Sequence, residues 1–325
     1  MIIKSVFTTL IICLAVSYSH SQQLTNWSSF YENGFIWNPA LTARWNTWEL
    51  STTVHKEWTD FENAPEYGTI GFQYPFVKRE TKLSLGGYID YDKVGPYQKS
   101  SLAGTIAYKF KPLLFGNRDD VFSLGGKMSF NNYRFSPQNF TPFDGFEGDP
   151  NLINQQTSAI APNMSLGAYY VSVSDFYSFR SHYYFGLSAN QILPTRLTVS
   201  NQEDITQTVH ATAHAGYRYS PKRSPYYIEP NIFISYGFKK AINVMANLRY
   251  ERVDKYWLSA GLVSNIEAFA QVGFVFNDQS ILGWLVKDGA LRIGSKVDYN
   301  FGSIGQFSGL GYEAYVAYLF NNEPF

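Results

Sequence analysis

The stretch from Gly309 to Phe320 reads GLGYEAYVAYLF, and its side chains alternate in character from one residue to the next. Successive side chains of a β-strand leave opposite faces of the sheet, so this alternation predicts a strand. One face carries Tyr312, Ala314, Val316, Tyr318 and Phe320, and the other carries Glu313, Tyr315, Ala317 and Leu319. A strand with an apolar outer face and a single inward carboxylate fits the wall of a transmembrane barrel.

The same alternation recurs along the chain, for example in SSLAGTIAYKF (100–110), VHATAHAGYRY (209–219) and AINVMANLRYER (241–252). Each has aliphatic residues ending in Tyr or Phe on one face and a charged residue on the other. We count about fourteen such segments of ~9–11 residues, the length that a tilted strand needs to cross a bilayer. They start near Trp48, Tyr67, Lys82, Ser100, Val121, Asn163, Ser181, Val209, Ile228, Ala241, Lys255, Ile266, Leu291 and Gly311. The prediction is an all-β protein, a closed antiparallel transmembrane β-barrel whose even strand number leaves no open edge in lipid.

Composition supports a membrane barrel over a soluble sandwich or jelly roll, which would also alternate. Of the 325 residues, 18% are aromatic and 16% are charged, and the formal net charge is zero. Soluble domains carry about 25% charged residues. Because nucleic-acid binding needs a basic field, nucleic acid is excluded as an expected partner, and the lipid bilayer is expected instead.

The chain is expected to be exported to the bacterial outer membrane. Residues 1–21 contain Lys4, an apolar run and then small polar residues, which is the pattern of a secretory signal peptide; a membrane anchor is the alternative. Cys13, the only cysteine, lies in this run, so the mature chain is expected to have no disulfide. Residues 22–46 form an aromatic-rich segment that precedes the barrel at 47–325. We expect it to pack into the periplasmic end, with Asn38 and Pro39 making the turn into the first strand.

Short motifs at both ends of the chain carry a further signal. The N-terminal set is Asn38-Pro39-Ala40, Lys56 and Trp58 at the end of the first strand, and Ala64-Pro65. The C-terminal set is Arg292 and Gly294 on one strand, Asp298-Tyr299 further along it, and Glu313 on the closing strand. In order and spacing these residues resemble the PorP/SprF family of Bacteroidetes outer-membrane proteins, which is linked to type IX secretion and gliding motility.

The resemblance implies a non-enzymatic outer-membrane component that helps to export a large adhesin-like client, or attaches that client to the cell surface. The implied partners are the client and periplasmic or outer-membrane components of type IX secretion. Composition and periodicity predict only the barrel. A small-solute channel and an outer-membrane hydrolase remain alternatives, although the chain has no Gly-x-Ser-x-Gly elbow.

Ionisable residues on the inward face form the main candidate site. Besides those in the C-terminal motifs they are Asp90, Lys109, Lys127, His210, His214, Arg218, Glu229, Arg249, Glu251 and Lys296. Mixed charges in a narrow barrel predict a network of internal salt bridges, and a polar pore or a socket for a partner is the sharper hypothesis. We expect Glu313 to pair with Arg292 or Lys296. His210 and His214 lie about 13 Å apart along a strand, too far for one metal ion, so no metal or other cofactor is expected.

A long outer loop contains Asp144, Glu147 and Asp149 together with Phe140, Phe143 and Phe146. The acidic spacing differs from the twelve-residue calcium loop, so a solvated surface loop is the favoured interpretation. The three aromatic residues predict a contact surface or a loop that folds into the barrel.

Overall fold

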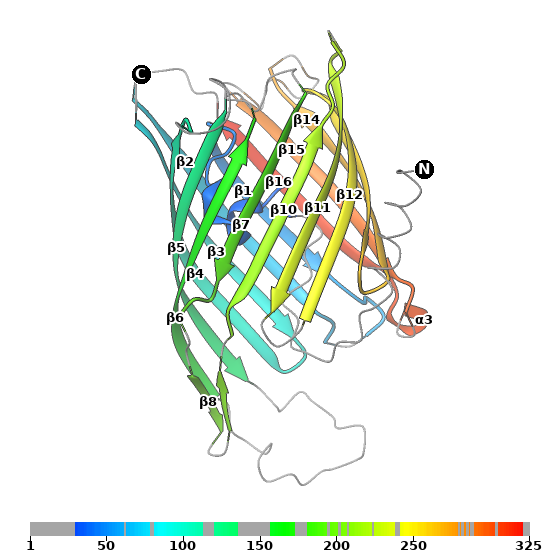
Figure 1. Ribbon diagram of the computed structural model, residues 1–325. Coiled ribbons are helices and arrows are strands. Elements are labelled where there is room, and N and C mark those ends of the chain that lie inside the picture. The colour runs from blue at the N-terminus through cyan, green and yellow to red at the C-terminus, as the bar shows by residue number, and fades with distance from the viewer. Residues whose placement is uncertain are drawn as a thin grey trace, which may run out of the picture.

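The computed structural model describes a closed barrel with a short segment inside it (Figure 1). The described residues are 30–61, 63–78, 81–112, 120–135, 157–172, 181–193, 196–200, 203–206, 208–222, 224–237, 241–278, 280, 283, 286, 289–302 and 305–320. The predicted signal peptide, the acidic and aromatic residues of the loop before Thr157, and most of residues 279–288 lie outside this set.

Fourteen of the described strands form the barrel, each antiparallel to both neighbours. They are β1 (Trp48–Lys56), β2 (Glu66–Lys78), β3 (Thr81–Val94), β4 (Tyr97–Phe110), β5 (Val121–Phe135), β6 (Thr157–Val171), β7 (His182–Asn190), β10 (His210–Arg218), β11 (Tyr226–Gly237), β12 (Ala241–Arg252), β13 (Tyr256–Val263), β14 (Glu267–Phe276), β15 (Gly289–Asn300) and β16 (Gly311–Phe320). β1 pairs with β16, with Trp48 opposite Phe320 and Lys56 opposite Tyr312. This seam closes the barrel, and the predicted closed antiparallel barrel is confirmed.

We call the end where β1 begins and β16 ends the terminal end, and the opposite end the distal end. On the terminal side, ring contacts join outward-facing aromatic residues of the same strand or of neighbouring strands. Trp48 packs against Tyr74 and Phe320, and Phe110 packs against Tyr108 and Phe122. Aromatic belts of this kind lie at the boundary between lipid tails and headgroups.

Five strands exceed the predicted length by two residues or more. β2 to β6 contain 13 to 15 residues, and β6 begins at Thr157 rather than near Asn163. Their outward residues at the distal tip are polar, because Lys93 on β3 lies opposite Gln98 on β4, and Gln98 lies opposite Arg134 on β5. Sheet pairing therefore continues beyond the apolar band. The thickness of the bilayer predicts only the part of each strand that crosses the membrane.

A small hairpin was also not predicted. β8 (Arg196–Ser200) and β9 (Glu203–Thr206) form a separate two-stranded sheet between β7 and β10, where the sequence suggested only a loop. It extends from the distal end of the barrel (Figure 1). Residues 196–206 contain no long apolar run. The pairing of β8 with β9 therefore left no hydrophobic pattern from which a hairpin could be predicted.

The wall has the predicted two faces. On β16, Tyr312, Val316 and Phe320 are exposed, whereas Glu313 and Tyr315 are buried. Similar outward apolar residues occur on other strands, among them Leu50, Ile70, Ile89, Leu102, Leu187 and Leu248. Exposed apolar rows around a closed wall are what a lipid-facing surface requires. Among the described residues, no helix is both long and apolar enough to cross a membrane.

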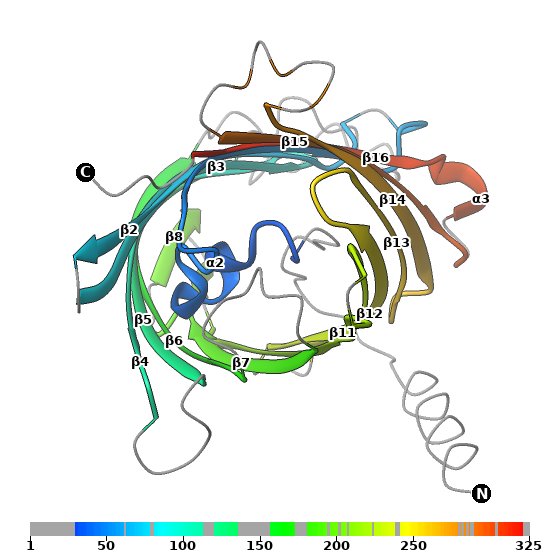
Figure 2. The same ribbon diagram turned by 90° about the horizontal axis from the view of Figure 1, so that it is seen from above.

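Residues 30–46, which we call the lumen segment, lie inside the barrel (Figure 2). They contain the helical turn α2 (Gly34–Trp37) and the 3₁₀ turn η1 (Pro39–Leu41). Phe30, Phe35, Ile36 and Leu41 join a buried apolar cluster with wall residues that include Tyr88, Tyr169 and Phe233. The burial of this apolar surface explains why an aromatic-rich stretch precedes the first strand.

The predicted position of Asn38 and Pro39 at the entry to the first strand is wrong. These residues link α2 to η1 deep in the lumen, and the chain turns toward β1 later, through Ala43 and Asn46 with positive φ angles of 48° and 53°. Asparagine tolerates this backbone region better than most residues, so Asn46 suits the turn.

Candidate functional site: the lumen segment and its contacts with the wall

Asn38 anchors the lumen segment to one side of the wall. Its side-chain nitrogen donates to the carbonyl oxygens of Ala168 on β6 (3.1 Å) and Leu187 on β7 (3.3 Å). Its side-chain oxygen accepts from the backbone N–H of Ala40 at 3.0 Å and so caps η1. One buried amide side chain thus joins two strands to the segment and satisfies a helix-end donor.

Three glycines give this anchor its space. Gly125 on β5, Gly167 on β6 and Gly186 on β7, which we call the glycine seat, face Asn38, Pro39 and Ala40. A Cβ atom at Gly167 would lie 2.0 Å from the Asn38 side-chain oxygen, and one at Gly125 would lie 2.3 Å from the Ala40 nitrogen. Gly125 and Gly167 are cross-strand partners, so their two open positions adjoin, whereas Gly186 lies opposite Tyr169 and also makes room for the ring of His214. Glycine inside a strand often marks such a close backbone approach.

Around the glycine seat, the wall holds the segment by its backbone carbonyl groups. Lys127 donates to Ile36 O at 2.7 Å, and Ser123 donates to Ala40 O at 2.8 Å. Ser188 and Asn190 both donate to Trp37 O, at 2.8 and 2.9 Å. Lys109 donates to Ala43 O and, at 2.9 Å, to the side chain of Asn46. These wall donors satisfy carbonyl groups that would otherwise be buried without partners.

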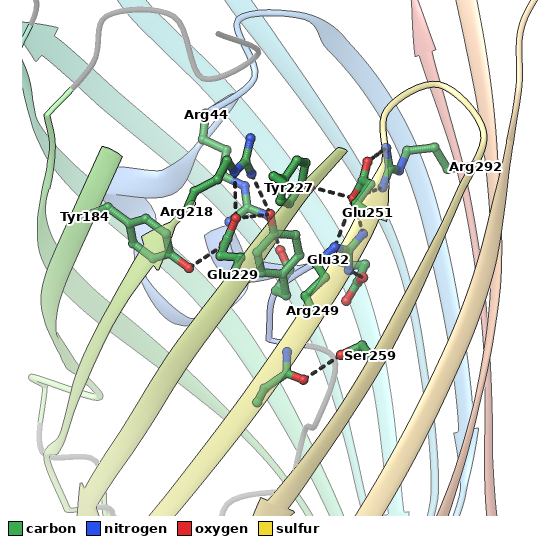
Figure 3. Close-up of polar contacts among 12 residues, drawn as sticks. Glu32, Arg44, Tyr184, Arg218, Tyr227, Glu229, Arg249, Glu251, Ser259 and Arg292 are labelled. Atoms are coloured by element: carbon green, nitrogen blue, oxygen red, sulfur yellow. Dashed lines mark hydrogen bonds and ion pairs between the residues drawn. The ribbon is translucent and has the colours of Figure 1, made fainter. Parts of the chain in front are cut away.

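The other side of the segment meets charged groups, which we call the arginine network (Figure 3). It comprises Tyr31, Glu32, Tyr184, Arg218, Tyr227, Glu229, Arg249, Glu251 and Arg292. All except Arg292 are less than 9% exposed, and the members come from β7, β10, β11, β12, β15 and the lumen segment.

The first half of the network centres on Glu229. Arg218 donates to this carboxylate at 2.7 Å, and the hydroxyl groups of Tyr184 and Tyr31 donate to it at 2.7 and 3.2 Å. Arg218 also donates to the Tyr31 oxygen at 2.8 Å. Burial raises the pKa of the Tyr31 phenol, so this side chain keeps its proton and acts as a donor to Glu229.

The second half centres on Arg249. It donates to Glu32 of the lumen segment at 2.7 Å and to Glu251 at 2.7 Å, and Arg292 donates to Glu251 at 3.1 Å. The indole of Trp257 lies beside both guanidinium groups, at 5.0 Å from Arg249 and 4.5 Å from Arg292. Gly273 and Gly294 leave room for this indole, since a Cβ at either would lie within 2.8 Å of it. Each buried charge therefore has an opposite charge or a ring against it.

The structure distributes the predicted inward residues over separate groups. Arg218, Glu229, Arg249, Glu251 and Arg292 belong to the arginine network, whereas Lys109 and Lys127 contact backbone carbonyl groups. Glu313 lies 3.5 Å from Lys296, which also pairs with Asp298 at 2.9 Å. His55, which we had not singled out, lies 3.3 Å from Asp298. Asp90 lies 3.8 Å from Lys99.

Of the two predicted inward histidines, His214 contacts aromatic rings and His210 lies near the distal end of the barrel. His214 is buried among rings, 4.9 Å from Phe30 and 5.7 Å from Tyr169 between ring centroids. His210 lies near the distal end of the same strand and is half-buried. The described residues contain no group of three His, Cys, Asp or Glu side chains arranged to hold a metal ion.

The remaining motif residues lie at the distal turns and on the outer wall. Lys56 pairs with Glu66 at 3.2 Å on the exposed surface, and Pro65 O accepts from the Glu57 N–H. Trp58 sits in this turn with a φ of 48°, Ala64 is buried beside it, and Tyr299 packs on Phe301 on the outer face.

Several members of the site were missed because we considered only ionisable wall residues of the barrel. Tyr184 and Tyr227 occupy inward positions of their strands, so strand alternation could have identified them. Tyr31 and Glu32 lie in the lumen segment, which is not a strand. Its side chains do not alternate in a regular way, so the sequence does not indicate which strand each one contacts. Nothing in the sequence identified the glycine seat, because its three members lie on separate strands far along the chain from Asn38.

A closed barrel with lipid-type outer rows and a polar, filled interior defines the class of outer-membrane β-barrel proteins. Residues 19–318 match the family described as type IX secretion system membrane protein PorP/SprF. The chain therefore belongs to the PorP/SprF family. No curated protein matches the chain.

Solved structures of other barrels share the fold. A CymD monoaromatic hydrocarbon channel matches with a TM-score of 0.53 and 10% identity, covering 90% of this chain and 93% of that chain. A Pseudomonas aeruginosa FadL homologue matches with a TM-score of 0.50 and 9% identity, over 88% and 93% of the two chains. At this identity the likeness concerns the fold alone.

Proposed function

We propose that this protein is a non-enzymatic component of type IX secretion that helps to export an adhesin-like client or to hold it at the cell surface. Membership of the PorP/SprF family supports the link to secretion. The observation that carries the proposal within this chain is the lumen segment, which is anchored to the wall on two sides. A barrel filled in this way is suited to presenting a surface to other proteins rather than to passing solutes.

The contacts of the lumen segment argue against a role as an open pore. Wall side chains from β4, β5 and β7 bind its carbonyl groups, and Arg218 and Arg249 bind Tyr31 and Glu32 from the other side. Moving the segment would take Tyr31 away from Glu229 and Glu32 away from Arg249, and both wall residues are fully buried. Breaking a buried ion pair of this kind costs ~3–5 kcal/mol.

The first experiment separates the secretion role from the small-solute channel. The native protein would be purified from outer membrane, its bound proteins identified by mass spectrometry, and its conductance measured in planar bilayers. We expect a bound secreted client and only low conductance. Large steady conductance without a bound client would contradict the proposal and support a channel.

A matched variant tests the part played by the lumen segment. Replacing residues 30–46 with a Gly/Ser linker of equal length should raise the conductance, because it removes the material that fills the lumen. Labelling with an activity-based serine probe tests the hydrolase alternative separately. A labelled serine at a reproducible position would contradict a non-enzymatic role.

A further inference from the structure

The distal end carries an apolar surface that takes no part in the lumen contacts described above. Phe61, Ile266, Phe301, Phe307 and Leu310 project there from three neighbouring turns, and we call them the distal apolar rim. Phe307 is 68% exposed, and Ile266 and Phe301 are each 63% exposed. Large apolar side chains seldom gather in this way on a water-facing loop, and such a patch marks an interaction site.

The rim is held in place by backbone hydrogen bonds between the turns. Thr59 N donates to Leu310 O at 3.2 Å and Asp60 N donates to Ser308 O at 3.3 Å, which joins the β1–β2 turn to the β15–β16 loop. Phe301 N donates to Ile266 O at 2.8 Å, which joins that loop to the β13–β14 turn. The apolar side chains therefore sit on one connected platform across the β1–β16 seam.

The position of the rim continues the lipid-facing wall. Phe301 has the same strand parity as Val297 and Tyr299, which face outward on β15, and its ring packs on Tyr299 at 5.0 Å. Figure 2 shows α3 (Gly305–Ser308), which carries Phe307, outside the ring of strands rather than over the lumen. The surface thus points sideways, toward the bilayer.

Charge distinguishes this loop from its neighbour. Between Asp298 and Glu313 the sequence contains no Lys, Arg, His, Asp or Glu, whereas the β1–β2 turn contains Glu57, Asp60 and Glu62. A loop without charge that displays Phe and Leu matches the boundary between headgroups and acyl chains, where aromatic side chains are favoured.

We propose that the distal apolar rim, whose most exposed side chain is Phe307, is a membrane-surface anchor that dips into the bilayer leaflet at the distal end. The lipid acyl chains next to the headgroups are its partner. The rim fixes the rotation and depth of the barrel at the side where the seam lies, while the long β2–β6 side projects with polar tips.

The test uses single cysteines, for which the chain offers a clean background because Cys13, the only cysteine, lies in the predicted signal peptide and can be replaced by serine. Phe307→Cys carries an environment-sensitive NBD label in full-length mature protein, reconstituted in phosphatidylcholine vesicles with doxyl-labelled phosphatidylcholine. Val316→Cys, on the lipid-facing wall, is the positive control. Gln98→Cys, an outward residue at the tip of the long strands, is the control for water exposure.

We expect the Phe307 label to be quenched about as strongly as the Val316 label and more strongly than the Gln98 label, with a blue-shifted emission. Leu310→Cys serves as a second reporter should Phe307→Cys fail to fold. Quenching no greater than at Gln98 would overturn the proposal. Protection that appears only when a protein partner is added would also overturn it, because the rim would then be a protein-docking surface.

Discussion

The two sides of the lumen hold the same segment by different means. On the side of β4 to β7, glycines create a hollow and the wall binds backbone carbonyl groups, so the fit depends on shape and on hydrogen bonds. On the side of β10 to β15, buried arginines and carboxylates bind Tyr31 and Glu32 through specific side chains. On the shape-based side most hydrogen bonds go to the backbone of the segment, with Asn38, Thr42 and Asn46 as side-chain partners, whereas the charged side depends on the identity of each partner.

This difference has an energetic consequence. Removing a donor on the carbonyl side leaves a neutral group without a partner, whereas removing an arginine on the charged side leaves a buried carboxylate uncompensated. The second loss is larger because a charge without a partner is costly in a medium of low polarity. Four substitutions test this ordering.

Arg249→Met should have the largest effect, a loss of about 3–5 kcal/mol in the free energy of unfolding. It removes the arginine that pairs with Glu32, and it removes one of the two arginines that pair with Glu251. The measurement is urea unfolding in detergent micelles. Lys56→Met is the matched control, since the Lys56–Glu66 pair is about half exposed and should contribute only ~0–1 kcal/mol. Equal losses for the two variants would show that the buried pairs of the network contribute no more stability than an exposed surface pair.

Gly167→Ala should cost about 3 kcal/mol, because its Cβ would lie 2.0 Å from the Asn38 side-chain oxygen. Gly104→Ala is the control, since nothing lies within 4 Å of a Cβ at that position. In the background of Asn38→Gly, which removes the clashing side chain, the cost of Gly167→Ala should fall. Additive losses in the double variant would argue against a direct fit between the two residues.

Lys127→Met should cost about 2 kcal/mol, because it removes the hydrogen bond from the amine to Ile36 O and leaves only a carbonyl group behind. Its apolar chain keeps most of the packing volume. The comparison between the two sides requires this loss to be smaller than that of Arg249→Met in the same unfolding assay. A loss as large as that of Arg249→Met would remove the distinction.

Tyr31→Phe should have the smallest effect, about 1 kcal/mol, because it deletes one hydroxyl group from Glu229 while Arg218 and Tyr184 remain bound to that carboxylate. The ring and its contact with Arg249 are unchanged. The same assay measures it. Complete loss of the folded barrel would mean that the phenol carries far more of the network than its contacts indicate.

Much of the wall was predictable from the sequence. Alternation placed the strands, and the inward parity of Arg218, Arg249 and Glu313 put them in the lumen. Their partners were not predictable, because a pair such as Arg292 and Glu251 depends on barrel curvature and on which strands face each other across the interior. The sequence offered Arg292 and Lys296 equally as partners of Glu313, and the structure places Lys296 beside it.

The lumen segment marks the limit of pattern-based prediction. Its aromatic content indicated that it is buried, but its path follows from the glycine seat, whose three members come from separate strands. The long tips of β2 to β6 escaped prediction for a related reason. The bilayer sets the minimum length of a strand, and nothing in that requirement stops pairing beyond the lipid.

The tether between the lumen segment and the wall is very short, since only Thr47 separates Asn46, which is bound to Lys109, from Trp48 at the start of β1. Such a tether has almost no slack, so it transmits force. A pull that displaces the segment would act on β1 and hence on its pairing with β16, the joint that closes the cylinder. Mechanical load inside the protein and the integrity of its outer wall are therefore coupled through a single residue.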